Sequence, residues 1–145
     1  MAESRNSERL RELLDDYRVS GIDAVRSRLH PEIEWHAPPE WLEQKLYRGP
    51  DEVAELADFW LGQFEDYRLD VVHTIDIGDG RVAALVLQRG RIKESGAEVE
   101  QEAGWLVRFE DGLVRRNDVS FSWAETLEQA GLDPAEHLPS GSGGA

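Results

Sequence analysis

The sequence predicts an α+β domain in which helices pack on the concave face of a long, curved antiparallel sheet. At 145 residues, the chain has the size of one domain with one core. Up to about residue 66 the apolar residues recur mainly at helical spacing, and beyond it they alternate with a period of two. Helices and strands that are segregated along the chain in this way are typical of the α+β class.

Two helical stripes open the chain. Asn6 or Ser7 can cap the first helix, and Gly21 interrupts it. The second stripe ends before Pro31, because the residue before a proline avoids helical angles. The apolar residues of the two stripes are Leu10, Leu13, Leu14 and Tyr17, then Ile22, Val25 and Leu29.

A short strand and a stronger helix follow. Residues 32–37, "EIEWHA", alternate with a period of two, and residues 38–49, "PPEWLEQKLYRG", predict a loop or lid. Residues 49–66 predict the clearest helix, because Pro50 suits the first helical position and acidic residues follow it. The apolar stripe of this helix consists of Val53, Leu56, Ala57, Trp60 and Phe64.

Four long strands come after residue 66, separated by the turn sequences "GDG", "ESGAE" and "DG". Strands of about ten residues span about 33 Å, so such a sheet must twist and curl. A closing helix begins at the capping-box pattern of Ser122 and Glu125 and ends at Gly131. We expect a flexible N-terminus, one domain and a flexible tail, over residues 1–6, 7–132 and 133–145.

Composition and motifs narrow the function. The net charge of −14 opposes binding to nucleic acids and to anionic membranes. The chain has no cysteine, which excludes disulfides and thiolate chemistry. No apolar run could span a bilayer and the charged N-terminus has no signal-peptide pattern, so we expect a cytoplasmic protein. The four histidines show no metal-ligand spacing and no glycine-rich phosphate loop appears, so we expect no metal and no cofactor.

Five stretches together resemble the SnoaL-like branch of the nuclear transport factor 2-like superfamily: "HPEIEWHAPP", "YRGPDEVAEL", "RGRIKESGAEVE", "WLVRFEDGLVRR" and "AETLEQAGL". The resemblance implies a cone-shaped α+β barrel with a pocket, usually dimeric through the outer face of its sheet. The superfamily includes ketosteroid isomerases, polyketide cyclases, epoxide hydrolases, dehydratases and non-catalytic members, so the fold alone does not fix the function.

The sequence lacks the catalytic groups of these enzymes. Matched to the ketosteroid isomerases, it has Ala37 in place of the carboxylate base, Leu13 in place of the tyrosine and Trp105 in place of the oxyanion aspartate. The epoxide hydrolases need an arginine between two inward aspartates, but Asp118 is out of phase with the inward residues of its strand. The cyclases use an aspartate with a histidine, and no inward aspartate is found, which leaves histidine as the only plausible base.

Three polar residues are candidates for chemistry. His73 alternates with apolar residues, so it is either a general base at the cavity wall or a buried histidine that bonds a neighbour. A slip of one residue at a bulge would put Thr74 there instead. His36 is in phase with polar Glu34, so it either assists from the rim or lies at the surface. Asn117 is inward by alternation, and it either orients a ligand or bonds a neighbouring side chain.

The remaining candidates are expected to line the cavity or to form an interface. We expect ligand contacts from Trp35 and Trp105, by the family match, and from Trp60, Gln88 and Phe121, by periodicity. On the opposite face of the sheet, apolar side chains without a predicted cover suggest a homodimer interface: Ala83, Leu85 and Leu87.

Three functions remain open. The first is a cofactor-independent acid–base enzyme of isomerase, cyclase or hydratase type, with His73 as the base, Asn117 orienting the substrate and His36 assisting. The second is a non-catalytic protein that binds a hydrophobic small molecule. The third is a dimeric association module whose pocket is filled by tryptophans.

Overall fold

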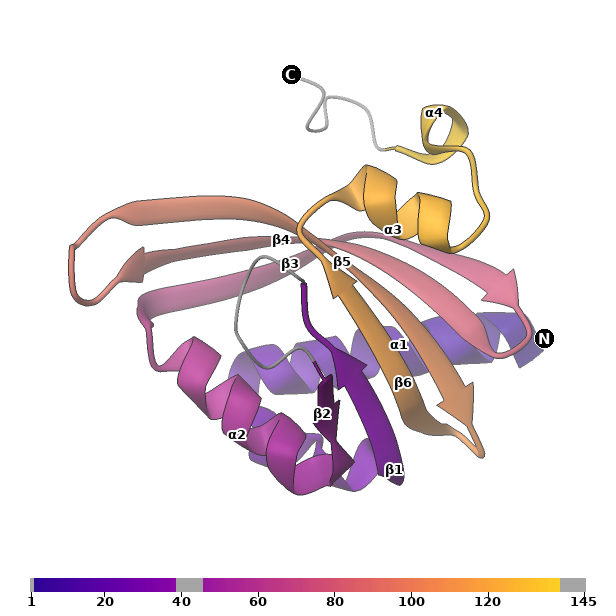
Figure 1. The fold of residues 1–145 in the computed structure, drawn as a ribbon, viewed down its shortest axis with the longest axis horizontal. Coiled ribbons are helices and arrows are strands. Elements are labelled where there is room, and N and C mark those ends of the chain that lie inside the picture. Colours follow the sequence, from indigo (N-terminus) through magenta and orange to yellow (C-terminus); the bar gives the residue numbers. More distant parts are fainter. Residues whose placement is uncertain (1, 39–45, 139–145) are drawn as a thin grey trace.

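The computed structural model describes residues 2–38 and 46–138, and it confirms the α+β class. Six strands form one curved, open sheet in the order β2-β1-β6-β5-β4-β3 (Figure 1). The strands are β1 Leu29–His36, β2 Leu46–Arg48, β3 Phe64–Gly78, β4 Arg81–Ile92, β5 Glu98–Glu110 and β6 Leu113–Ser120. The helices are α1 Ala2–Ser20, α2 Gly49–Leu61, α3 Trp123–Gln129 and α4 Pro134–His137, with 3₁₀ turns η1 Ile22–Ala24 and η2 Arg26–Arg28.

The sheet is mixed, whereas the sequence predicted an antiparallel one. Strands β3 to β6 form the predicted antiparallel meander. Strand β1, however, joins β6 in parallel, with Trp35 opposite Asn117, and the short β2 pairs antiparallel with β1 at the edge. This arrangement places a strand from the first third of the chain beside the last strand.

Helices α1 and α2 cover the concave face of the sheet (Figure 1). The apolar stripe predicted for the first helix packs there, and Leu10 and Leu14 are almost completely buried. From β4, the alternate residues Val82, Ala84 and Val86 contribute to the same core. The second helical stripe forms two 3₁₀ turns instead of a helix, and its apolar side chains still join this core.

Helix α3 lies on the convex face, which is a correction to the prediction that all helices pack on the concave face (Figure 1). Its N-cap is the predicted one, because the Ser122 side chain accepts a hydrogen bond from the backbone N–H of Glu125. The indole N–H of Trp123 reaches the sheet and is 2.9 Å from the carbonyl oxygen of Val86. Leu127 is fully buried against the same face.

Helix α3 covers the apolar residues of the convex face that suggested a homodimer interface from the sequence. Ala83 and Leu85 were expected to be exposed on the convex face, yet both are completely buried within the single chain. Leu87 also packs against the cluster that α3 forms with the sheet. The homodimer therefore stays a prediction that rests on the family resemblance alone.

A bulge in β3 reverses the side-chain directions that the sequence predicted for its second half. Val71 pairs with Val86 and His73 pairs with Leu85, so Val72 is an extra residue between two consecutive partners. Because Leu85 faces the convex side, His73 does as well, and Thr74 takes the inward phase opposite Ala84.

The ends of the described chain are more regular than expected. Helix α1 begins at Ala2, although the sequence predicted a flexible segment up to residue 6, and α4 forms a helical turn in the predicted tail. The predicted loop or lid lies partly outside the described residues, at 39–45. Among the described residues, no helix is both long and apolar enough to cross a membrane.

The seating of α3 depends on the absence of a side chain at Gly104. A Cβ added there would lie 1.9 Å from Thr126 Oγ1 and 2.5 Å from Thr126 Cβ. We therefore expect Gly104→Ala to lower the free energy of unfolding by about 1–3 kcal/mol, the usual range for an overpacked site. Urea denaturation followed by tryptophan fluorescence measures the change. An unchanged free energy of unfolding would contradict this contact.

Candidate functional site

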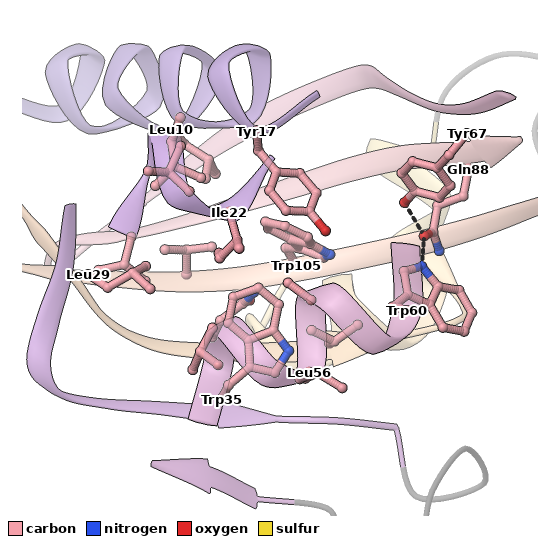
Figure 2. Close-up of a pocket in the computed structure, with 18 of the residues that line it drawn as sticks. Leu10, Tyr17, Ile22, Leu29, Trp35, Leu56, Trp60, Tyr67, Gln88 and Trp105 are labelled. Carbon is pink, nitrogen blue, oxygen red and sulfur yellow. Dashed lines mark hydrogen bonds between the residues drawn. The ribbon is translucent and has the colours of Figure 1, made fainter. Parts of the chain in front are cut away.

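A cavity of about 70 Å³ lies between the concave face of the sheet and the helices that cover it (Figure 2). Its walls come from α1, α2, η1 with the following Val25, and all strands except β2. Most of the lining side chains are apolar: Leu10, Leu13, Ile22, Val25, Leu29, Val53, Leu56, Ala57, Val107, Val114, Val119 and Phe121. The others are Tyr17, Trp35, Trp60, Tyr67, Gln88, Trp105 and Asn117.

Gln88 anchors a polar group at one end of the cavity. Its Oε1 accepts hydrogen bonds from Trp60 Nε1, at 2.9 Å, and from the hydroxyl of Tyr67 (Figure 2). An indole nitrogen can only donate, so the acceptor must be the amide oxygen, and the orientation of the amide is fixed. The Nε2 donor of Gln88 then has no protein partner among the described residues.

Asn117 is completely buried at the cavity wall with its hydrogen-bonding capacity unused. Its exposed fraction is 0%, and neither Oδ1 nor Nδ2 has a partner in the described part of the chain. A buried polar group left in this state costs about 1–3 kcal/mol. The alternative of a bond to a neighbouring side chain, open from the sequence, is not what the structure has. The arrangement leaves one donor and one acceptor available to a bound molecule.

Aromatic rings form much of the remaining wall. Trp35 and Trp105 meet edge to face with 5.1 Å between ring centroids, and both are only partly buried. Trp60 stacks on Phe121 at 6.3 Å on the side of Gln88. The five residues expected from the sequence to contact a ligand thus all lie at the cavity wall, and their ligand contacts remain a prediction.

Two tyrosines at the cavity were not singled out from the sequence. Burial strongly raises the pKa of the Tyr17 hydroxyl, and it does the same for Tyr67. Both hydroxyls are therefore neutral hydrogen-bonding groups near neutral pH. Tyr17 points its hydroxyl toward the side where Tyr67 and Gln88 lie (Figure 2). The sequence feature that could have predicted Tyr17 as a cavity residue is its hydroxyl group within an otherwise aliphatic helical stripe.

The two candidate histidines lie outside the cavity. His73 is exposed because of the bulge in β3, so its predicted place on the inward face was wrong. His36 follows Trp35 on β1 and points to the other face, where its Nε2 lies 3.1 Å from Glu34 Oε1. That hydrogen bond from His36 lowers the pKa of Glu34. Among the described residues, no cavity-lining side chain carries a carboxyl or imidazole group.

The described residues offer no cluster of side chains suited to a metal ion. They contain no group of three or more histidine, cysteine, aspartate or glutamate side chains that could hold a metal ion. The polar atoms at the cavity are amides, hydroxyls and indole N–H groups, which suit hydrogen bonding to an organic ligand.

The fold, a curved mixed sheet with two helices on its concave face, is similar to that of solved structures of the nuclear transport factor 2-like class. Within that class, the SnoaL-like domain model matches residues 8–117. The chain therefore belongs to the SnoaL-like domain family.

Solved structures with this fold have low sequence identity to the chain. A nuclear transport factor 2-like protein of unknown function from Burkholderia pseudomallei is 21% identical, with a TM-score of 0.71 over 85% of this chain and 95% of that one. A putative SnoaL-like polyketide cyclase from Jannaschia sp. is 15% identical, with a TM-score of 0.71 over 81% and 85%. A putative isomerase from Bacillus subtilis is 16% identical, with a TM-score of 0.72 over 90% and 95%. No curated protein matches the chain significantly.

The unpaired amide predicts that Asn117→Leu stabilises the ligand-free protein. The cavity gives the larger side chain room, and the substitution removes two unpaired polar atoms. We expect the free energy of unfolding to rise by about 1–3 kcal/mol, measured by urea denaturation. Thr126→Val is a matched comparison, because Thr126 Oγ1 is also buried and unpaired but lies away from the cavity. A loss of stability in Asn117→Leu would mean that the amide has a partner.

The buried tyrosines predict a loss of stability at alkaline pH. Because the folded-state pKa is raised, the unfolded state releases its phenolic protons first, near pH 10. The stabilisation is therefore complete below about pH 10 and declines above it, by up to about 1.4 kcal/mol per pH unit for each tyrosine. Tyr17→Phe should have a shallower decline of the unfolding free energy with pH. An identical slope in this variant would show that the hydroxyl ionises equally in both states.

Proposed function

We propose that this protein binds a small hydrophobic molecule that carries at least one hydrogen-bonding oxygen, in the cavity between α1, α2 and the sheet. The observation that supports this most strongly is Asn117, whose amide is fully buried and has no hydrogen-bond partner among the residues that the structure describes. An amide in an apolar wall destabilises the empty protein, and a ligand that pairs with it removes that cost.

The polar atoms at the wall describe the ligand. Asn117 offers one donor and one acceptor, and Gln88 offers the Nε2 donor that its fixed orientation leaves over. A carbonyl oxygen accepts from either donor, and a hydroxyl group pairs with the Asn117 oxygen. The rest of the ligand contacts Trp35 and Trp105, whose flat faces favour a ring.

The size of the cavity limits what binds without a change of shape. A volume of about 70 Å³ is about half that of an apolar cavity of about 150 Å³ that binds benzene in another protein. A ring-containing ligand therefore requires side chains to move. Trp35 and Trp105 are the side chains suited to this, because both are partly exposed and meet in a single edge-to-face contact.

The proposal is binding rather than acid–base catalysis. Neither His73 nor His36 lines the cavity, and the raised pKa of Tyr17 and Tyr67 keeps both hydroxyls protonated. If a bound carbonyl reacts, the protonated Tyr17 hydroxyl would polarise it, whereas the Tyr67 hydroxyl already donates to Gln88. An association module with a pocket filled by tryptophans is less favoured, because a void remains beside them.

The test compares two probes of similar size, acetophenone and isopropylbenzene, in the second of which a CH–CH₃ group stands in place of the carbonyl group. We expect both to bind and acetophenone to bind about threefold to tenfold more tightly, the effect of one hydrogen bond. Perturbation of the tryptophan indole N–H signals in NMR spectra gives the two dissociation constants. The proposal would be contradicted if neither probe bound.

Two substitutions test whether the Asn117 amide causes the preference for acetophenone. Asn117→Leu should remove the preference for acetophenone and retain binding of isopropylbenzene. Thr126→Val, which changes a buried unpaired hydroxyl outside the cavity, should leave both dissociation constants unchanged. If the two variants behave alike, the cavity amide is not the recognition group.

A further inference from the structure

Three arginines lie side by side on the convex face of the sheet. Arg81 on β4 pairs in register with Arg108 on β5, and Arg108 pairs in register with Arg116 on β6. Residues directly opposite on neighbouring strands have Cβ atoms about 5 Å apart and point to the same face. The face is the convex one, because Arg81 and Arg108 are in phase with Ala83 and Leu106. These two residues pack with Ala130, the C-cap residue of α3.

Within the part of the chain that the structure describes, Arg116 is the one member of this arginine row with a carboxylate partner. Arg116 donates two hydrogen bonds to the carboxylate of Asp118, at 2.9 and 3.0 Å. The side chains of Arg81 and Arg108 make no ion pair or hydrogen bond within the described residues. The protein has 30 acidic residues against 16 basic ones, so an uncompensated pair of cations is unexpected in its surface.

The row has an energetic cost. Like charges directly opposite each other on adjacent strands destabilise a sheet. Arg89 pairs with both Asp70 and Glu100, and Arg91 pairs with Glu98, whereas Arg68, which lies opposite Arg89, also has no ion pair among the described residues. Arg81 and Arg108 have no such carboxylate partner within residues 2–38 and 46–138, so both guanidinium groups are available to an anion.

The arginine row borders a groove of about 480 Å³. Its lining consists of Arg81, Leu106, Arg108, Arg116, Asp118 and Gln129. Gln129 ends α3, so the helix covers the apolar part of the convex face and stops where the arginines begin. The carboxylate of Asp118 also faces the groove, but both its oxygens are engaged by Arg116.

We propose that Arg81 and Arg108 bind a phosphate group in this groove, either as the free anion or as part of a larger molecule. A phosphate group with a charge of about −1.5 to −2 at neutral pH matches two guanidinium groups, whereas one carboxylate would leave a positive charge over. Guanidinium groups donate paired N–H bonds that suit phosphate oxygens. This site lies on the opposite face of the sheet from the cavity, so it stands independently of the proposed ligand.

The first experiment titrates inorganic phosphate, and separately glycerol phosphate, into the protein at constant ionic strength maintained with sodium chloride. We expect saturable shifts of the backbone NMR signals of Arg81, Arg108 and Gln129. Arg108→Gln should weaken binding at least about tenfold, the loss of one hydrogen bond to a charged group. Arg5→Gln is the matched control, because it makes the same charge change at an exposed arginine on α1 and should keep the affinity within twofold.

Thermal unfolding gives an independent readout. Without phosphate, Arg108→Gln should raise the melting temperature because it relieves the repulsion, and Arg5→Gln should not. Saturating phosphate should raise the melting temperature of the wild-type protein more than that of the Arg108→Gln variant. Tighter binding of glycerol phosphate identifies a phosphate carried on a larger molecule, and equal or tighter binding of inorganic phosphate identifies the free anion.

Two results would overturn the proposal. One is the absence of saturable binding by both probes, or an equal loss of binding in Arg5→Gln. The other is a protein that self-associates through this face, with Arg108→Gln converting a dimer to a monomer and phosphate having no effect. In that case the arginines would pair with acidic residues of a second copy.

Discussion

Burial of β4 on both faces is the constraint on which the rest of the structure depends. Residues 82–86 are all completely buried, although successive side chains of a strand point to opposite faces. The sheet therefore needs cover on both sides at this strand. Helix α1 supplies it on the concave face together with α2, and α3 supplies it on the convex face. The cavity is confined to the concave face, where the curvature of the sheet leaves space that the helices do not fill.

The sequence predicts that β4 is buried on both faces, but it does not show which element covers each face. The run at residues 82–86 predicts a strand that is apolar on both faces, and a second subunit or a helix of the same chain satisfies it equally. The choice depends on where α3 docks, which is a long-range contact. The alternation around β5 and β6 carried more information: the inward places of Trp105 and Asn117 follow from an unbroken register between those strands at these residues.

His73 shows where periodicity fails. The bulge at Val72 inserts a residue that is itself apolar, and the residues beyond it, Ile75 and Ile77, pack on the convex face. Since both faces of the sheet accept apolar side chains here, the pattern looks continuous in the sequence on either side of the bulge. The place of Tyr67 at the cavity was not predicted for a related reason. Its hydroxyl on β3 donates to Gln88 on the neighbouring strand β4, and no local sequence pattern shows a contact between strands.

The cavity contains two amides in opposite states. Gln88 has its oxygen satisfied twice by Trp60 and Tyr67, which holds the amide in one orientation. Asn117 has neither atom satisfied by the described residues, although an apolar side chain at this position would avoid the cost. A protein selected only for stability would keep the first amide and lose the second. The combination of one fixed donor and one open amide is the arrangement expected of a site preorganised for a ligand.

The groove on the convex face follows from the same packing that buries β4. Gly104 has no side chain, so Thr126 comes close to the backbone of β5, and this contact sets how far α3 lies along the sheet. Gln129 is one helical turn beyond Thr126, and it ends the helix beside Leu106 and Arg108. The length of α3 therefore divides the convex face into an apolar part buried within the chain and a cationic part left open to an anion.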